Sequence, residues 1–283
     1  MEALESMRLP KPEVQVKGRR GGQNRKEIQF KAHHLIQTID LSGFKDRRIS
    51  RSGLKELLDG IELLPCIRSL NLSNNGITDD FDKEVLQLFD VTKIKAVDLS
   101  HNNLRQLGLQ IGKKLRDEVS HISWVDLTMN DFDNDTQTVN TLIQGLKKQT
   151  RIIYVGLTVQ GNQSDQLVKL LQPKRPPTTM SLKMRNSLMT KSAFEWLGKC
   201  LVSQEFCLTA LNFKFCFLTF EMVKKLADSL RSNKTLTKLD LSNNGLCSAV
   251  TNYLLQALRV NIYVSDLNLH GNNLDDDFAV ELA

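Results

Sequence analysis

The sequence predicts an α/β solenoid, a curved stack of repeats with parallel strands on its concave face and helices on its convex face. The string LNLSNNGI at residues 70–77 returns almost unchanged as LDLSNNGL at residues 239–246. Related strings recur between these two at a nearly fixed period. Each is followed by a stretch with apolar residues at helical spacing. A fixed period is a stronger indication of fold than any local pattern.

Eight clear copies of the repeat align on one apolar position, and a degenerate ninth copy at residues 36–49 precedes them. A strand and a helix cannot bury both apolar faces alone, so the units must stack. We expect one repeat domain over residues 32–283, with about nine repeats. The last repeat is expected to be incomplete, because the chain stops at DDDFAVELA inside a helix. The aligned positions are residues 70, 97, 125, 155, 182, 211, 239 and 267.

Each copy follows the pattern LxxLxLxxNxL. Alternation places its fourth and sixth residues on one face of a short strand, pointing into the core. The Asn amide donates and accepts at once, so we expect it to satisfy backbone groups of its own turn and the adjacent one. Gln160 and Ser187 replace it in two middle repeats, where we expect the ladder of Asn side chains to be interrupted. The Asn residues are Asn75, Asn102, Asn130, Asn244 and Asn272.

This motif, at 27–30 residues with a helical return, resembles the leucine-rich repeats of the ribonuclease-inhibitor-like class. That class includes the Ran GTPase-activating proteins and the repeat domain of tropomodulins. The resemblance covers about residues 36–283 and implies a horseshoe-shaped solenoid. Cys is a common alternative to Asn in this family, which fits Cys216. The family binds many unrelated partners, so the resemblance implies a binding surface without naming a ligand.

A basic segment precedes the repeats. Residues 8–31 hold eight Lys or Arg and two Glu, a net charge of +6 that equals the total for the chain. We expect residues 1–31 to be a disordered arm. The arm is either a solvated tail or a charge-driven contact with an acidic surface, a nuclear-import receptor or nucleic acid. It contains a single aromatic, Phe30, so it offers no stacking platform. Its candidate contact residues are Lys17, Arg19, Arg20, Arg25 and Lys26.

A proline-rich stretch, QPKRPPTT at residues 172–179, interrupts the repeats. Prolines cannot continue a helix, so we expect a short helix and an extended convex loop here. The period resumes at once, which indicates a local irregularity and not a domain boundary.

Three patterns resemble ligand-binding or catalytic motifs, but a structural role explains each of them better. GLQIGKK at residues 108–114 lacks one residue and the hydroxyl of a phosphate-binding loop. DFDNDT at residues 131–136 lacks the Gly and Glu of a calcium loop and suits a helix cap. His101 and His270 are expected on the concave side. His270 could neighbour Ser242 and Asp266, but an open strand surface has no oxyanion pocket. We therefore expect no catalytic, cofactor or metal site, and no enzyme activity.

The five cysteines form no CxxC pair and lie in apolar surroundings such as LPCI and KFCF. They indicate small buried hydrophobic residues in a reducing compartment. The first residues, MEALESMRLP, lead us to expect no signal peptide, and no apolar run approaches the length of a membrane span. We expect a cytoplasmic protein, with a nuclear or a cytoskeletal and ciliary location as alternatives.

The centre of the concave face is the candidate binding site. Motif positions three, five, seven and eight point outward there, and most repeats fill them with small or acidic groups. The middle repeats carry aromatic and basic residues instead, a composition typical of interface hot spots. The alternative is that one or two of these aromatics fold back over gaps left by the degenerate repeats. The candidates are Trp124, Tyr154, Lys183, Arg185, Lys214 and Phe215.

These features favour a non-enzymatic interaction scaffold or adaptor that holds a protein partner on the concave face, with no small-molecule substrate. The alternative is a GTPase activator or another enzyme regulator, as the resemblance to Ran GTPase-activating proteins suggests. We assign none of that family's functional residues to positions in this sequence. Nucleic-acid binding through the arm is a weaker alternative, because the repeat region is near neutral.

Overall fold

The computed structural model describes residues 36–43, 48–61, 63–117, 121–132, 135–170, 180–203 and 205–282. The chain divides into two units, residues 1–31 and residues 32–283. The arm residues Lys17, Arg19, Arg20, Arg25 and Lys26 lie outside the described residues, so their disorder and their contacts stay predictions.

Nine strands form one parallel sheet, in which neighbours follow the order of the chain. The register pairs equivalent motif positions, so Val125 lies between Val97 and Val155. This confirms that each copy of the motif supplies one strand. The strands are β1 (Thr38–Asp40), β2 (Ser69–Asn71), β3 (Ala96–Asp98), β4 (Trp124–Asp126), β5 (Tyr154–Gly156), β7 (Met180–Lys183), β9 (Leu208–Asn212), β10 (Lys238–Asp240) and β11 (Asp266–Asn268).

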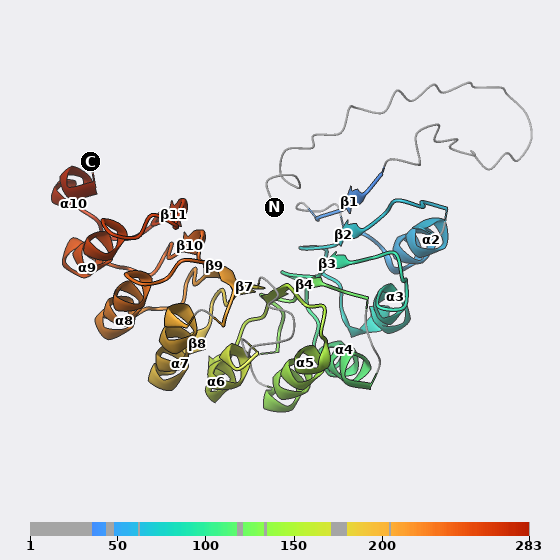
Figure 1. The fold of residues 1–283 in the computed structure, drawn as a ribbon. Coiled ribbons are helices and arrows are strands. Elements are labelled where there is room, and N and C mark those ends of the chain that lie inside the picture. The colour runs from blue at the N-terminus through green and yellow to red at the C-terminus, as the bar shows by residue number, and fades with distance from the viewer. Residues whose placement is uncertain are drawn as a thin grey trace, which may run out of the picture. The chain divides into compact units, whose positions relative to one another are not determined.

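A helix follows each strand of the sheet, and within the unit 32–283 the helices lie on the convex side (Figure 1). The α/β solenoid is therefore confirmed. The helices are α2 (Arg51–Ile61), α3 (Asp82–Leu88), α4 (Gln106–Asp117), α5 (Thr136–Lys148), α6 (Asn162–Val168), α7 (Lys191–Val202), α8 (Phe220–Leu230), α9 (Ser248–Leu258) and α10 (Asp276–Leu282). A 3₁₀ turn, η2 (Asp79–Phe81), leads into α3.

The middle of the array is irregular, as the prolines predict. Helix α6 spans seven residues, and a separate two-stranded sheet joins β6 (Gln160–Gly161) to β8 (Leu188–Met189). Strand β5 nevertheless pairs directly with β7, so the main sheet continues across this region. The proline-rich residues 172–179 lie outside the described residues.

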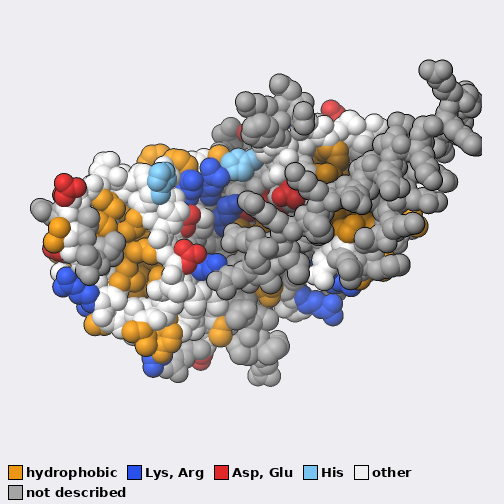
Figure 2. Space-filling view, turned by 90° about the horizontal axis from the view of Figure 1, so that it is seen from above, with side chains coloured by type: hydrophobic (Ala, Val, Ile, Leu, Met, Phe, Trp, Pro, Cys, Tyr) orange, Lys and Arg blue, Asp and Glu red, His pale blue; other side chains and the backbone are white. Residues whose placement is uncertain are grey.

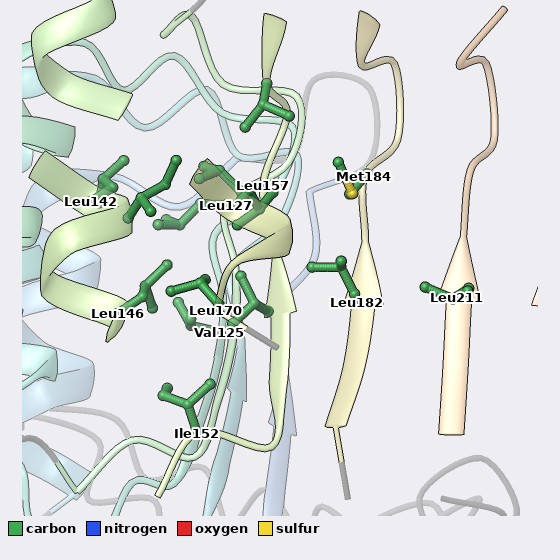
Figure 3. Packing of buried hydrophobic residues seen from close by; sticks show 14 of the residues in the cluster. Val125, Leu127, Leu142, Leu146, Ile152, Leu157, Leu170, Leu182, Met184 and Leu211 are labelled. Carbon is green, nitrogen blue, oxygen red and sulfur yellow. The ribbon is translucent and has the colours of Figure 1, made fainter. Parts of the chain in front are cut away.

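The core lies between the sheet and the helices. The fourth and sixth motif residues, such as Val125 and Leu127, are buried against helix residues such as Leu142 and Leu146 (Figure 3). Met184 stands in for a leucine in the repeat of β7 and is also fully buried. One continuous apolar core of mostly aliphatic side chains therefore runs through the repeats.

The Asn ladder has the predicted chemistry. Asn102 Oδ1 accepts hydrogen bonds from the backbone N–H groups of Asn75 and Ile77, in the preceding turn. Its Nδ2 donates to the carbonyls of Leu72 and Leu99. One amide thus satisfies backbone groups of two successive repeats, in an environment where unpaired groups would be costly.

In the middle of the array, other groups replace the Asn. The Ser187 hydroxyl accepts from the Val159 N–H, and the Cys216 thiol donates to the Met184 carbonyl. The Cys216 N–H in turn donates to Asn244 Oδ1, where the Asn ladder resumes. The interruption is therefore confirmed, and Cys216 takes over the donor role of the Asn.

A second set of amides, which the sequence analysis did not identify, links the ends of the helices. Asn233 Nδ2 donates to the Leu201 carbonyl, and Asn261 Nδ2 donates to the Leu230 carbonyl. Gln149 does the same with the Leu115 carbonyl. Each amide lies three residues before the first leucine position of the next motif. This constant spacing is the sequence pattern from which the second set could have been predicted.

The helical patterns weighed for function have structural roles. The Asp135 carboxylate caps α5 by accepting from the N–H groups of Gln137 and Thr138, which confirms the capping role expected for DFDNDT. Its hydrogen bond from the Thr138 hydroxyl lowers the pKa of Asp135. In GLQIGKK, Gly108 and Gly112 lie inside α4, where they face α5.

Not all cysteines are buried as expected. Cys200 and Cys216 are buried, and burial raises the pKa of each thiol to about 12. Cys66 and Cys207 are half-buried. Cys247 is exposed, so the expectation is wrong there, because Cys247 lies at the N-cap of α9 and not inside the helix.

Candidate functional site

The six candidate residues come from neighbouring repeats, and we call them the concave cluster: Trp124, Tyr154, Lys183, Arg185, Lys214 and Phe215. They belong to β4, β5, β7 and the turns that follow β7 and β9. Five of the side chains are half-buried, and Phe215 is 37% exposed. Seen from above the view of Figure 1, basic and histidine side chains gather beside acidic ones on this side of the molecule (Figure 2).

Trp124 and Tyr154 stack on each other. They are direct neighbours in the register of β4 and β5, with ring centroids 4.2 Å apart and planes inclined by 13°. The Tyr154 hydroxyl donates to Asp126 Oδ2 at 3.0 Å. Burial, and then the Asp126 charge, hold the pKa of Tyr154 well above its usual value. The pair is therefore an ordered aromatic stack whose hydroxyl is held by a buried carboxylate.

Asp126 organises the acidic side of the site, and the sequence analysis did not identify it. Its side chain is 1% exposed, and Oδ2 lies 2.7 Å from the Lys183 ammonium. Its Oδ1 accepts a 2.6 Å hydrogen bond from the Thr128 hydroxyl. These partners satisfy a charge that would otherwise be costly to bury.

Gly156 makes this ion pair possible. It lies between Asp126 and Lys183 in the register of β4, β5 and β7. A Cβ at this position would stand 2.5 Å from Asp126 Oδ1, so any side chain would collide with the carboxylate. At the fifth motif position, the neighbouring strands β4, β5 and β7 therefore carry Asp126, Gly156 and Lys183. This combination can be recognised only once the register of the strands is known.

Arg185 extends across several repeats to His101. Its Nη1 lies 2.8 Å from His101 Nε2. Because guanidinium groups only donate, Nε2 accepts and the imidazole is neutral in this arrangement. Burial, followed by the charges of Arg185 and Lys183, lowers the pKa of His101. The contact with Arg185 agrees with the concave position expected for His101.

We expect an NMR titration of the folded protein to give His101 a pKa below the ordinary histidine value of about 6.5. As the pH falls through that value, the unfolded chain gains a proton that folded His101 does not, so folding stability decreases. Arg185→Gln removes a repelling cation and should raise the pKa of His101. Arg151→Gln, on an exposed turn, should leave it unchanged. A pKa of His101 that does not respond to Arg185→Gln would contradict the observed pairing.

Phe215 lies between two cations. The Arg185 Cζ is 5.7 Å and the Lys214 Nζ 5.5 Å from the ring centroid, within the range of cation–π contacts. Phe215 has a backbone φ of +58°, in the left-handed region that bulky residues rarely adopt. Asn74, Asn186 and Asn243 fill the same motif position with similar φ values. The repeat thus imposes this conformation, and here it holds an exposed aromatic ring.

The acidic and basic parts of the surface lie side by side. Burial, and then the Asp126 charge, raise the pKa of Asp98 in β3.

His270 is exposed near the other end of the sheet, and the described residues show no bond that joins it to Ser242 or Asp266. Over the described part of the chain, no group of three or more His, Cys, Asp or Glu could hold a metal ion. None of the helices in that part is long and apolar enough to span a bilayer.

A family model described as "Leucine Rich repeat" matches residues 64–80 and 232–246. These segments contain the two strings that are nearly identical in sequence. The match agrees with the motif spacing and with the one-strand, one-helix repeat of the structure.

Several solved structures are similar to this chain. The actin-binding site 2 of leiomodin-1 is 15% identical, with a TM-score of 0.37, and the match covers 43% of this chain and 69% of that one. An internalin from Listeria monocytogenes is 18% identical, with a TM-score of 0.39 and coverages of 79% and 67%. TLR13, in a complex with ssRNA13, is 17% identical, with a TM-score of 0.43 and coverages of 87% and 34%.

Proposed function

This chain is a leucine-rich repeat protein, and we propose that it acts as a non-enzymatic scaffold or adaptor that binds a protein partner on its concave cluster. The observation that carries this proposal is the exposed Phe215 ring with Arg185 and Lys214 in cation–π distance, on the same sheet as the Trp124–Tyr154 stack. Aromatic and Arg side chains on a rigid support are the groups that supply most of the energy in protein interfaces.

Rigidity supports the proposal further. The ring stack and the contacts with Asp126 hold three side chains of the cluster in place, namely Trp124, Tyr154 and Lys183. Side chains that are already ordered lose little conformational freedom when a partner binds. The other repeats present small groups such as Ser73, Ser100 and Ser242 at the seventh position. The middle repeats therefore differ from the rest where a partner would make contact.

Two further elements belong to this proposal. The residues of the arm add a charge-driven contact with an acidic surface, and the protein works in the cytoplasm, with the nucleus or the cytoskeleton as alternatives. The helical return of each repeat is the feature that favours the ribonuclease-inhibitor-like class. The alternative function is a GTPase-activating role, and the pull-down described next tests it as well.

The test is an affinity pull-down from cell lysate, analysed by mass spectrometry, with wild-type protein and one variant as baits. The variant carries Trp124→Ala, Arg185→Ser, Lys214→Ser and Phe215→Asn. Each new residue is the one that other repeats of this chain carry at the same motif position, as in Ala96, Ser73 and Asn74. Lys183 stays unchanged because it neutralises buried Asp126.

We expect the variant to keep the circular dichroism spectrum of the wild type and to lose a defined set of partners. A GTPase among the lost partners would support the alternative function. A matched bait with Arg151→Ser and Lys225→Ser, on an exposed turn and on α8, should keep every partner. Identical lists from the wild type and the variant would overturn the proposal.

A further inference from the structure

The cations of the concave cluster fall into two groups. Lys183 is neutralised by Asp126 at 2.7 Å. Arg185 and Lys214 have no carboxylate within ion-pair distance among the described residues. The hydrogen-bond partner of the Arg185 guanidinium is the neutral His101 imidazole, and the buried Arg185 Nε has none. This guanidinium therefore has unused donors and an uncompensated charge.

Exposed apolar residues follow these cations closely in the chain. Phe217, two residues after Phe215, is 70% exposed and also has a positive φ, of +50°. Leu188 occupies the same motif position one repeat earlier and is 53% exposed. Three exposed apolar residues thus follow β7 and β9 within three residues of Arg185 or Lys214 in the chain, and one of them, Phe215, contacts both cations.

We propose that Arg185, Lys214, Phe215 and Phe217 form a docking site for a short acidic segment of a protein partner. A carboxylate of that segment binds the Arg185 guanidinium, and a neighbouring apolar side chain packs on the two Phe rings. This proposal rests on the proposed function and specifies the chemistry of the partner. A guanidinium fork matches a carboxylate, and an aromatic ring below it orients the fork.

Charge decides between the possible occupants. Two cations without carboxylates attract an acidic segment and repel a basic one. The basic segment of this chain, with a net charge of +6 over residues 8–31, is therefore the wrong occupant. Exposed Phe and Leu side chains also favour a peptide with apolar groups over a purely anionic ligand.

The experiment selects peptides from a random twelve-residue phage library on the full chain, and then measures each synthetic peptide by fluorescence anisotropy. We expect the selected peptides to contain Asp or Glu beside an aromatic or aliphatic residue. Arg185→Gln should weaken their binding by roughly tenfold to a hundredfold, as expected when a charge-assisted hydrogen-bond pair is lost. Arg151→Gln removes an equal charge from an exposed turn and should have no effect.

Two further variants separate geometry from charge. Arg185→Lys keeps the charge without the fork, and we expect it to bind as weakly as Arg185→Gln. Phe215→Asn removes the ring but suits the left-handed backbone, so it should weaken binding while the fold is retained. Restored binding in Arg185→Lys would contradict the proposed fork contact.

Several outcomes would overturn the inference. These are peptides without carboxylates, binding that Arg185→Gln does not change, and selection that recovers no Arg185-dependent peptide. Tighter Arg185-dependent binding of a (dT)12 oligonucleotide would assign the surface to nucleic acid instead. Peptides resembling DDDFAV of residues 275–280, together with self-association in analytical ultracentrifugation, would assign it to a second copy. If the four-substitution bait loses partners but peptide binding needs no acid, the proposed function stands and only this inference fails.

Discussion

Asn102→Ala is expected to lower the free energy of unfolding by about 3–5 kcal/mol. The Asn102 carboxamide oxygen is the acceptor for the N–H groups of Asn75 and Ile77, and Asn102 is itself buried. Removing the amide leaves both N–H groups buried without a partner, and each such group costs about 1–3 kcal/mol. The carbonyls of Leu72 and Leu99 lose one donor but keep another, from Asn75 and Asn130.

Asn103→Ala is the matched control. Asn103 is the next residue, its side chain is exposed, and its backbone N–H bond to the Ile77 carbonyl survives the substitution. We expect its effect to stay within about 0.5 kcal/mol. Urea unfolding followed by circular dichroism compares the two variants, and hydrogen exchange at Ile77 locates the loss. Equal stability of the two variants would show that the Asn side chain does not support the stack.

The fold was predictable because the same physical requirement is repeated nine times. Each strand must bury a fourth and a sixth residue, and each turn must satisfy its backbone groups, so the sequence repeats Leu, Leu and Asn. Because the pattern recurs, it can be recognised even where a single copy matches it poorly. Met184 and Cys216 fit their places in the structure although neither matches the pattern.

The concave cluster was predictable only in composition. The sequence shows which side chains leave the strands, but not which distant repeats they reach. Lys183 crosses Gly156 to Asp126, and Arg185 reaches His101 across 84 residues of sequence. Both contacts depend on the register and on the lengths of the side chains, which no single motif contains. The amides of Asn233 and Asn261 were missed because their signal lies outside the eleven-residue motif.

The repeats that break the motif also carry five of the six cluster residues, all except Trp124. Gln160, Ser187 and Cys216 replace the Asn in the repeats of β5, β7 and β9, and these repeats supply Tyr154, Arg185 and Phe215. Departures from local rules tend to gather at functional sites, where they are tolerated because the surrounding structure compensates. The strained φ of Phe215 fits that view, since its N–H donates to the Ser242 carbonyl in the regular repeat of β10, which holds the turn in place.

Gly112→Ala is expected to destabilise the protein by about 2–4 kcal/mol, although Ala is the better helix former by about 1 kcal/mol. Gly112 lies inside α4, and a Cβ there would stand 2.7 Å from the Leu142 nitrogen and 2.8 Å from the Thr141 carbonyl carbon. Both atoms belong to the backbone of α5, so no side chain can move aside. Gly145 on α5 faces the Gly112 carbonyl just as closely, and Gly145→Ala should have a similar effect.

Gly60→Ala, in contrast to Gly112→Ala, is expected to raise the free energy of unfolding. Gly60 lies in α2, and a Cβ there meets no atom within 4 Å, so the helix-propensity gain of up to about 1 kcal/mol is unopposed. Thermal unfolding of the three variants tests the close approach of α4 and α5 directly. If Gly112→Ala stabilised the protein as Gly60→Ala does, these helices would stand further apart. The glycines of GLQIGKK would then need an explanation other than packing.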